Sequence, residues 1–182
     1  MLEETLEIKT LEIDACQTDY ELLSWTSQFF DRQVELEQPS KTPSVVDNLV
    51  LDRRKAELEA YPQLLSTLVR TFRDRYQEPH VALAVFDRAR RVSINSYVRG
   101  CSTTTYNELL TTIWICFRDL ERVAKLLTEM EENGISPDAE TKRLAERIIM
   151  SNSLNERTTE TWTLLQRIES LADCGRVSED DV

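Results

Sequence analysis

Residues 103–138 decide the fold: TTTYNELLTTIWICFRDLERVAKLLTEMEENGISPD. Apolar side chains recur at helical spacing in two runs, 107–118 and 120–132. Gly134 follows the second run, where a left-handed C-terminal cap is needed, and Pro137 stands where no helix can continue. Two helices joined by so short a connection form an antiparallel hairpin.

The segments on either side of this stretch follow the same plan. Residues 61–91 hold two apolar stripes, and we place Pro62 and Pro79 in the first turns of the two helices. A fainter pair covers residues 140–173. Each hairpin has an apolar seam that a neighbour must cover. The sequence therefore predicts an all-α fold of stacked antiparallel helical hairpins at about 61–91, 106–133 and 140–173.

The N-terminal part differs in composition and is predicted as a separate segment. Residues 14–32 are typical of a helix capped by Thr18 or Asp19. A linker follows with Pro39 and Pro43, and residues 45–60 are expected to be helical. We divide the chain into an acidic N-terminal helix with its linker, 1–42, and a helical-repeat domain, 43–182.

Composition argues against metal, cofactor and catalytic chemistry. The four cysteines, Cys16, Cys101, Cys116 and Cys174, lack metal-ligand spacing, and His80 is the only histidine. We expect buried free thiols without a disulfide framework. The chain shows no phosphate-binding glycine loop and no nucleophile motif, so we predict a non-enzyme without a cofactor or small-molecule substrate. No run of 18 apolar residues indicates a membrane span.

Charge is distributed unevenly along the 182 residues. The net charge is -11, yet residues 53–99 carry ten Lys and Arg against five Asp and Glu. The arginines of this basic segment are Arg70, Arg73, Arg75, Arg88, Arg90, Arg91 and Arg99. They form either a phosphate footprint or a solvated helical face paired with nearby carboxylates. Three tryptophans, at 25, 114 and 162, lie on apolar stripes and favour core packing over base stacking.

The opening stretch resembles a pentatricopeptide repeat. The match rests on Thr105, Tyr106, Asn107, Ala124, Met130, Gly134, Ile135, Pro137 and Asp138. Tyr61 and Tyr106 begin equivalent units 45 residues apart, within the range of helical repeats. The family's pattern places a uracil-reading pair on Asn107 and Asp138. However, this unit is one residue too long, and Asn107 could instead cap a helix while Asp138 begins the next turn.

A narrower resemblance covers most of the chain. It is similar to the C-terminal domain of the fungal family historically called mitochondrial transcription factor two. The residues that carry it are Cys16, Thr18, Asp19, Glu21, Trp25, Gly100, Cys101, Trp114, Phe117, Arg118, Asp119 and Leu120. This resemblance implies a mitochondrial matrix protein near the inner membrane that works with translation activators and the mitochondrial RNA polymerase. A presequence is not seen in this chain.

Together these features predict a pentatricopeptide-like α-solenoid that acts as an interaction module in mitochondrial RNA metabolism. Its expected partners are protein subunits of a translation-activator complex, the mitochondrial RNA polymerase and single-stranded mitochondrial mRNA. The predicted RNA-contact residues are Asn107, Asp138, Arg70, Arg73, Arg88 and Arg91. The alternative is a direct single-stranded RNA-binding repeat protein.

Overall fold

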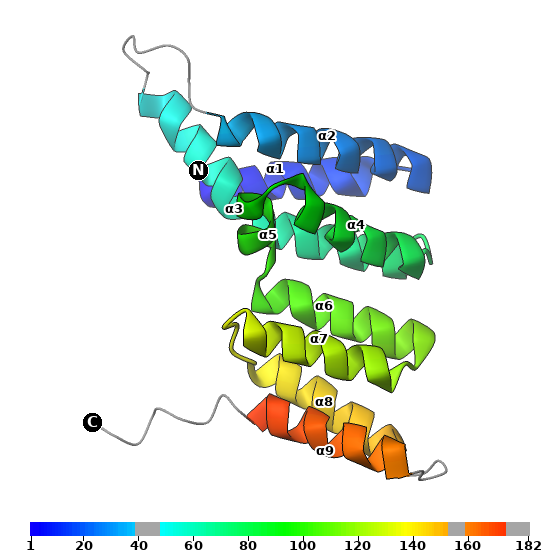
Figure 1. Ribbon diagram of the computed structural model, residues 1–182. Helices are drawn as coiled ribbons and strands as arrows, with labels where there is room; N and C mark the ends of the chain where they lie inside the picture. Colours follow the sequence, from blue (N-terminus) through cyan, green and yellow to red (C-terminus); the bar gives the residue numbers. More distant parts are fainter. Residues whose placement is uncertain (39–47, 153–158, 174–182) are drawn as a thin grey trace, which may run out of the picture. The chain divides into compact units, whose positions relative to one another are not determined.

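The computed structural model describes residues 1–38, 48–152 and 159–173 (Figure 1). Within these residues every regular element is a helix, so the predicted all-α helical-repeat fold is confirmed. The elements are α1 (Leu2–Ala15), α2 (Asp19–Glu37), α3 (Asn48–Asp74), α4 (Pro79–Val92), α5 (Ile94–Gly100), α6 (Thr103–Thr112), the π-helical turn η1 (Ile113–Phe117), α7 (Leu120–Glu132), α8 (Ala139–Asn152) and α9 (Thr159–Asp173). They fall into two compact units, Met1–Gly100 and Cys101–Val182.

The first unit is built around the long helix α3, which contacts α1, α2, α4 and α5. Its buried face is continuous, with Leu65, Leu68, Val69 and Phe72 fully enclosed. Burial of such side chains is the main force that holds the helices together. Consecutive helices run in opposite directions, as the colour sequence in Figure 1 shows. The predicted hairpin at 61–91 is therefore present as α3 and α4.

One N-terminal feature differs from the sequence prediction, because helix α1 was not predicted. The predicted cap of the next helix is confirmed: α2 begins at Asp19, where the Thr18 hydroxyl accepts from the Glu21 amide at 3.2 Å. Only Ile13 of α1 is buried, so the helix needs no continuous apolar stripe, and the sequence pattern for a helix is weak there. The predicted division at residue 42 remains a prediction; in the structure α1 and α2 both contact α3.

Pro62 was expected in a first helical turn, and this was wrong. It lies inside α3, which is continuous from Asn48 to Asp74. Proline there removes one backbone hydrogen bond and normally favours a helix end. The neighbouring Ala60 and Tyr61 are completely buried, so tertiary packing outweighs this local preference.

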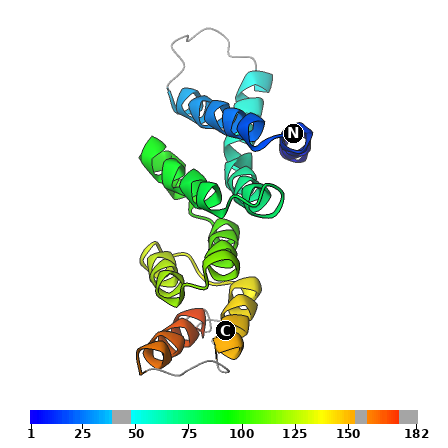
Figure 2. The same ribbon diagram turned by 90° about the vertical axis from the view of Figure 1, so that its right-hand side faces the viewer.

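The second unit consists of two hairpins that pack as layers. Helix α6 contacts α8, and α7 contacts α9, so the first helices of the two hairpins form one layer and the second helices form the other (Figure 2). The buried residues of α7, among them Val123, Leu127 and Met130, face this core. The hairpins predicted at 106–133 and 140–173 correspond to α6–α7 and α8–α9, with residues 153–158 outside the described part.

The C-terminal cap predicted for α7 at Gly134 is confirmed. Gly134 has a φ of 70°, in the left-handed region. Its amide donates to the Glu131 carbonyl at 2.9 Å, and the Ile135 amide donates to the Met130 carbonyl at 2.9 Å. These two bonds form a Schellman motif, which satisfies the last carbonyls of the helix. The chain is thereby directed through Pro137 to the start of α8.

Across the described residues, no helix combines the length and apolar character needed to cross a lipid bilayer.

Candidate functional site

The predicted base-reading pair is brought together at the junction between α6 and α8. The Asn107 Nδ2 group donates to the Asp138 Oδ1 atom at 3.0 Å. The Thr141 hydroxyl donates to the Asn107 Oδ1 atom at 2.6 Å. Asn107 is 3% exposed, so both ends of its amide are used inside the protein. The pair therefore holds two hairpins of the second unit together.

Asp138 also caps α8. Its Oδ1 atom accepts from the backbone amides of Glu140 and Thr141 at 2.9 and 2.8 Å. The Asp138 amide donates back to the Thr141 hydroxyl at 3.2 Å, which completes a reciprocal capping arrangement. Partial burial tends to raise the pKa of Asp138, but the hydrogen bonds from Thr141, Asn107 and Glu140 outweigh it and lower this pKa.

The one-residue excess of this repeat coincides with the π-helical turn η1. A π turn holds more residues than an α turn, so it can absorb an added residue without changing the ends of the helix pair. The turn ends at Arg118, which has a φ of 54°. Despite the extra residue, Asn107 and Asp138 remain within hydrogen-bonding distance.

Tyr106 connects the first turn of α6 to the C-terminal end of α7, next to the Asn107–Asp138 contact. Its hydroxyl donates to the Glu129 Oε1 atom at 2.8 Å and accepts from the Asn133 Nδ2 group at 2.9 Å. The side chain is fully buried. Burial, together with the hydrogen bonds to Cys101 and Glu129, raises the pKa of the Tyr106 phenol far above its ordinary value. The tyrosine thus stays neutral and fixes α6 against the end of α7.

The predicted RNA-contact arginines of α3 have different environments. Arg73 is buried, with 7% of its side chain exposed, and forms an ion pair with Asp74 at 2.6 Å. Arg70 is exposed, one turn earlier on the helix, and its charge contributes to a lowered pKa of Asp74 after the larger effect of the hydrogen bond from Arg73. Arg73 therefore serves the internal structure of the unit.

The two predicted RNA-contact arginines of α4, Arg88 and Arg91, lie one turn apart and line the same hollow. Arg88 donates to the Ser27 hydroxyl at 3.1 Å and lies over the Phe30 ring at 5.2 Å, which ties α4 to α2. Arg91 is exposed and lines the same shallow hollow as Arg88 and Asp87. Of the predicted arginines, Arg70 and Arg91 are the more accessible to a phosphate group.

The tryptophans and cysteines only partly follow expectation. Trp114 is buried in the second unit, as predicted, whereas Trp25 is half-buried and lines a cavity. The Trp162 side chain and Cys174 lie outside the described part. The expectation of buried thiols was wrong for Cys116, which is exposed because it lies on the outer side of η1 beside the exposed Ile115. Cys16 and Cys101 are half-buried.

Sequence reasoning missed Thr141, which completes the contact between Asn107 and Asp138. The signal was present, because Asp138 and Thr141 are three residues apart at the start of a predicted helix, the spacing of reciprocal caps. It also missed Glu129, whose partnership with Tyr106 depends on the length of the hairpin and cannot be deduced from spacing alone.

Two comparisons relate the chain to known proteins. A 67-residue segment, 37% of this chain, is 39% identical to "Mitochondrial translation factor 2" of Schizosaccharomyces pombe. The matched segment covers 21% of that protein. No solved structure matches the chain. The model of the Mtf2 family matches residues 1–177, and the chain belongs to this family.

Proposed function

We propose that this chain is a non-enzymatic helical-repeat interaction module in mitochondrial mRNA processing, stability and translation activation. It acts in the mitochondrial matrix and binds protein subunits of a translation-activator or RNA-polymerase-coupled complex, with auxiliary contact to single-stranded mRNA. Association with the inner membrane is peripheral and runs through these partners. Family membership and the name of the fission-yeast relative support the mitochondrial, translation-related role.

One observation favours a protein partner over RNA as the main ligand: the Asn107 amide is already hydrogen-bonded within the protein. Both of its polar atoms are bonded to Asp138 and Thr141. A base would have to break these bonds before it could be read. Arg73 and Arg88 are likewise engaged within their own unit. The residues expected to recognise RNA thus mainly stabilise the hairpins.

Exposed apolar side chains supply surface for a protein partner. On α1, Ile8 is 46% exposed and Leu11 is 62% exposed, one turn apart on the first hairpin. On α8, Met150 is 72% exposed. Apolar side chains exposed on the first and last hairpins of a repeat protein are available for contact with a protein partner.

A direct RNA-binding function is the second candidate, favoured by one observation. Asn107 and Asp138 lie 3.0 Å apart at a hairpin junction, where a pentatricopeptide-like unit would read one uracil. A single such unit gives little sequence specificity. The net charge of -11 also weakens attraction to phosphates.

The test is a titration of labelled uridine-rich and adenine-rich RNA into the protein across a salt series, with Asn107→Ala as the variant. We expect weak binding, on the order of 10⁻⁴–10⁻⁶ M, that changes little in the variant because it is mainly electrostatic. Nanomolar, uracil-selective binding that disappears in Asn107→Ala would establish the RNA-reading function instead. Ser136→Ala, an exposed change in the same junction, is the control.

A further inference from the structure

A cavity of about 350 Å³ lies among α1, α2 and α3 of the first unit. Trp25, Phe29 and Leu64 provide apolar lining, and Gln33 adds a polar group. Its size is at the lower end of the range for small-molecule sites. Among the described residues that line the cavity, seven are polar or charged and three are apolar, so a ligand would meet hydrogen-bonding groups beside the aromatic rings.

Gln33 is the unusual member of this lining. The residue is 4% exposed, and its side-chain amide makes no hydrogen bond to another described residue. The amide lies at the cavity surface, where it offers a donor and an acceptor side by side. The cavity is therefore suited to a ligand that presents the complementary pair.

An aromatic stack forms the adjacent wall. The Trp25 and Phe29 ring centroids are 5.4 Å apart with an interplanar angle of 13°, and Phe29 stacks on Tyr61 at 5.2 Å and 10°. The indole N–H of Trp25 donates to the Glu12 Oε2 atom at 2.9 Å, which fixes the ring. Aromatic walls of this kind suit planar ligands.

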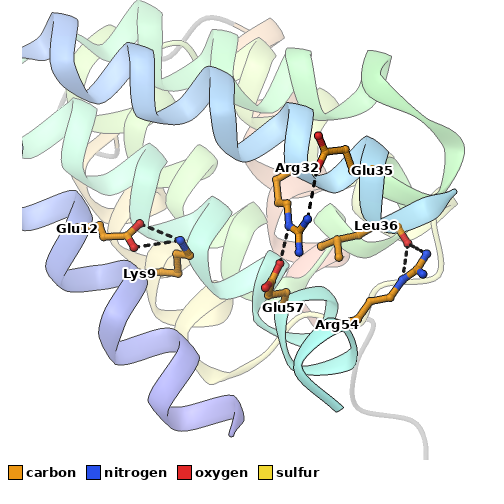
Figure 3. A network of polar contacts seen from close by, with 7 residues as sticks. All are labelled: Lys9, Glu12, Arg32, Glu35, Leu36, Arg54 and Glu57. Atoms are coloured by element: carbon orange, nitrogen blue, oxygen red, sulfur yellow. Dashed lines mark hydrogen bonds and ion pairs between the residues drawn. The ribbon is translucent and has the colours of Figure 1, made fainter. Parts of the chain in front are cut away.

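Paired charges line the cavity, and Figure 3 shows the Lys9–Glu12 pair on α1 and the pair that joins Arg32 of α2 to Glu57 of α3. Lys9 pairs with Glu12 at 2.9 Å, and Arg32 pairs with Glu57 at 2.9 Å. Partial burial tends to raise the pKa of Glu12, but hydrogen bonds from Lys9 and Trp25 lower it. Both carboxylates can accept hydrogen bonds from hydroxyl groups, and both cations can meet phosphate.

A second hollow lies beside the cavity on the same helices and includes one more cation, Arg53. A neighbouring hollow shares Lys9, Glu12, Arg32 and Glu57 with the cavity and extends to the exposed Arg53. The cations along this path outnumber the carboxylates by one. An anionic group on a ligand would be accommodated at this end.

We propose that the cavity binds the nucleoside part of an adenine nucleotide. The base lies against Trp25 and Phe29, and its amino group N6 and the adjacent ring nitrogen pair with the Gln33 amide, as glutamine pairs with adenine in nucleic-acid recognition. The ribose hydroxyls bond to Glu12 or Glu57, and the phosphate extends toward Arg53. The source is either a free nucleotide or an unstacked adenine of single-stranded RNA.

This inference goes beyond the proposed function and does not involve Asn107. The test is calorimetric titration of the full chain with adenosine, guanosine, cytidine and uridine monophosphates, and with a short oligoadenylate. Gln33→Leu removes the amide at similar volume, and Gln63→Leu, an exposed position on α3, is the matched control. We expect adenosine monophosphate to bind at least about tenfold more weakly to Gln33→Leu, and equally well to Gln63→Leu.

The outcomes separate the two sources and the competing explanations. Binding of the mononucleotide that depends on Gln33 supports a nucleotide site, and binding of oligoadenylate alone, with the same dependence, assigns it to RNA. Equal binding by Gln33→Leu, or no binding of any adenine probe at millimolar concentration, overturns the proposal. If Gln33→Leu does not fold, NMR decides: adenosine monophosphate must shift the Trp25 indole and Gln33 amide signals of the unmodified protein, and unchanged signals reject the site.

Discussion

The hairpins α3–α4 and α6–α7 each bury one tyrosine completely, Tyr61 and Tyr106, but end in different ways. In α6–α7 the Tyr106 hydroxyl bonds to Glu129 and Asn133, and Gly134 turns the chain directly toward the next hairpin. In α3–α4 the Tyr61 hydroxyl instead bonds to Ser96, on the extra helix α5. Both tyrosines fix their hairpins through the hydroxyl group, whereas the chain leaves the two hairpins in different ways.

The difference follows from the residues after the second helix. The sequence after α7 supplies a glycine and a proline that permit a left-handed cap and a stop. The sequence after α4 lacks them, and a short helix covers the end of the hairpin. Gly100 permits this covering, because a Cβ atom there would lie 2.9 Å from the Leu65 Cδ2 atom and 3.6 Å from Tyr61.

The largest effect is expected at the core of α6–α7. Trp114→Ala should lower the free energy of unfolding by about 3–5 kcal/mol, because it removes a large buried side chain and leaves a cavity. Since the chain forms two compact units, the loss should appear in the melting of the second unit while the first retains its transition. Urea denaturation followed by circular dichroism measures both.

Ile115→Ala is the control for this change, since Ile115 is the exposed neighbour of Trp114. It should change stability by less than about 0.5 kcal/mol. If Trp114→Ala remained as stable as the unmodified protein and lost only RNA binding, Trp114 would be a stacking platform, and the assignment of the tryptophan to the core would be wrong.

The two tyrosine hydroxyls test whether the anchors are equivalent in energy. Tyr106→Phe should cost about 1.5–3 kcal/mol, because its hydroxyl bonds to a carboxylate and leaves Glu129 partly buried without that partner. Tyr61→Phe should cost about 0.5–1.5 kcal/mol, because it loses a bond between neutral hydroxyls. Paired urea titrations decide the order, and a larger loss at Tyr61 would contradict the comparison.

A change at Gly134, the left-handed cap after α7, should have the next largest effect on the free energy of unfolding. Gly134→Val should cost roughly 1–2 kcal/mol, since a β-branched residue resists the left-handed conformation. No atom lies within 4 Å of the position of its Cβ, so the cost comes from the backbone alone. Gly134→Asn should be tolerated better. An unchanged melting temperature for the valine variant would show that the cap contributes nothing.

Much of the fold was predictable because the relevant signals are local. The apolar stripes and Gly134 gave the hairpins of the second unit, and Thr18 gave the start of α2. Predictions failed where distant contacts decide the structure. Pro62 lies inside α3 because Tyr61 and its neighbours are buried by other helices, which the local pattern does not show.

The candidate site was predictable only in part. The family pattern identified Asn107 and Asp138, and the structure brings them together. Whether an amide is free or already bonded depends on its position in three dimensions, so the engagement of Asn107 with Thr141 was not apparent. The same holds for Gln33, whose isolation in a cavity follows from the packing of three helices.

The smallest effect concerns the acid sensitivity of the α6–α8 junction. The pKa of Asp138 is lowered in the folded protein, so its stabilising effect is present above the unfolded value of about 3.9 and disappears as pH falls through the folded value. Because the residue is exposed, solvent screening should keep this contribution below about 1 kcal/mol.

Asp138→Asn retains an acceptor for the cap but cannot titrate. Glu12 and Asp74 also have lowered pKa values, so the unmodified protein and the variant both lose stability in acid. The difference between their urea midpoints isolates Asp138: it should be constant from pH 7 to 5 and shrink between pH 4 and 2. Curves that remain parallel over this range would show that the charge of Asp138 does not stabilise the junction.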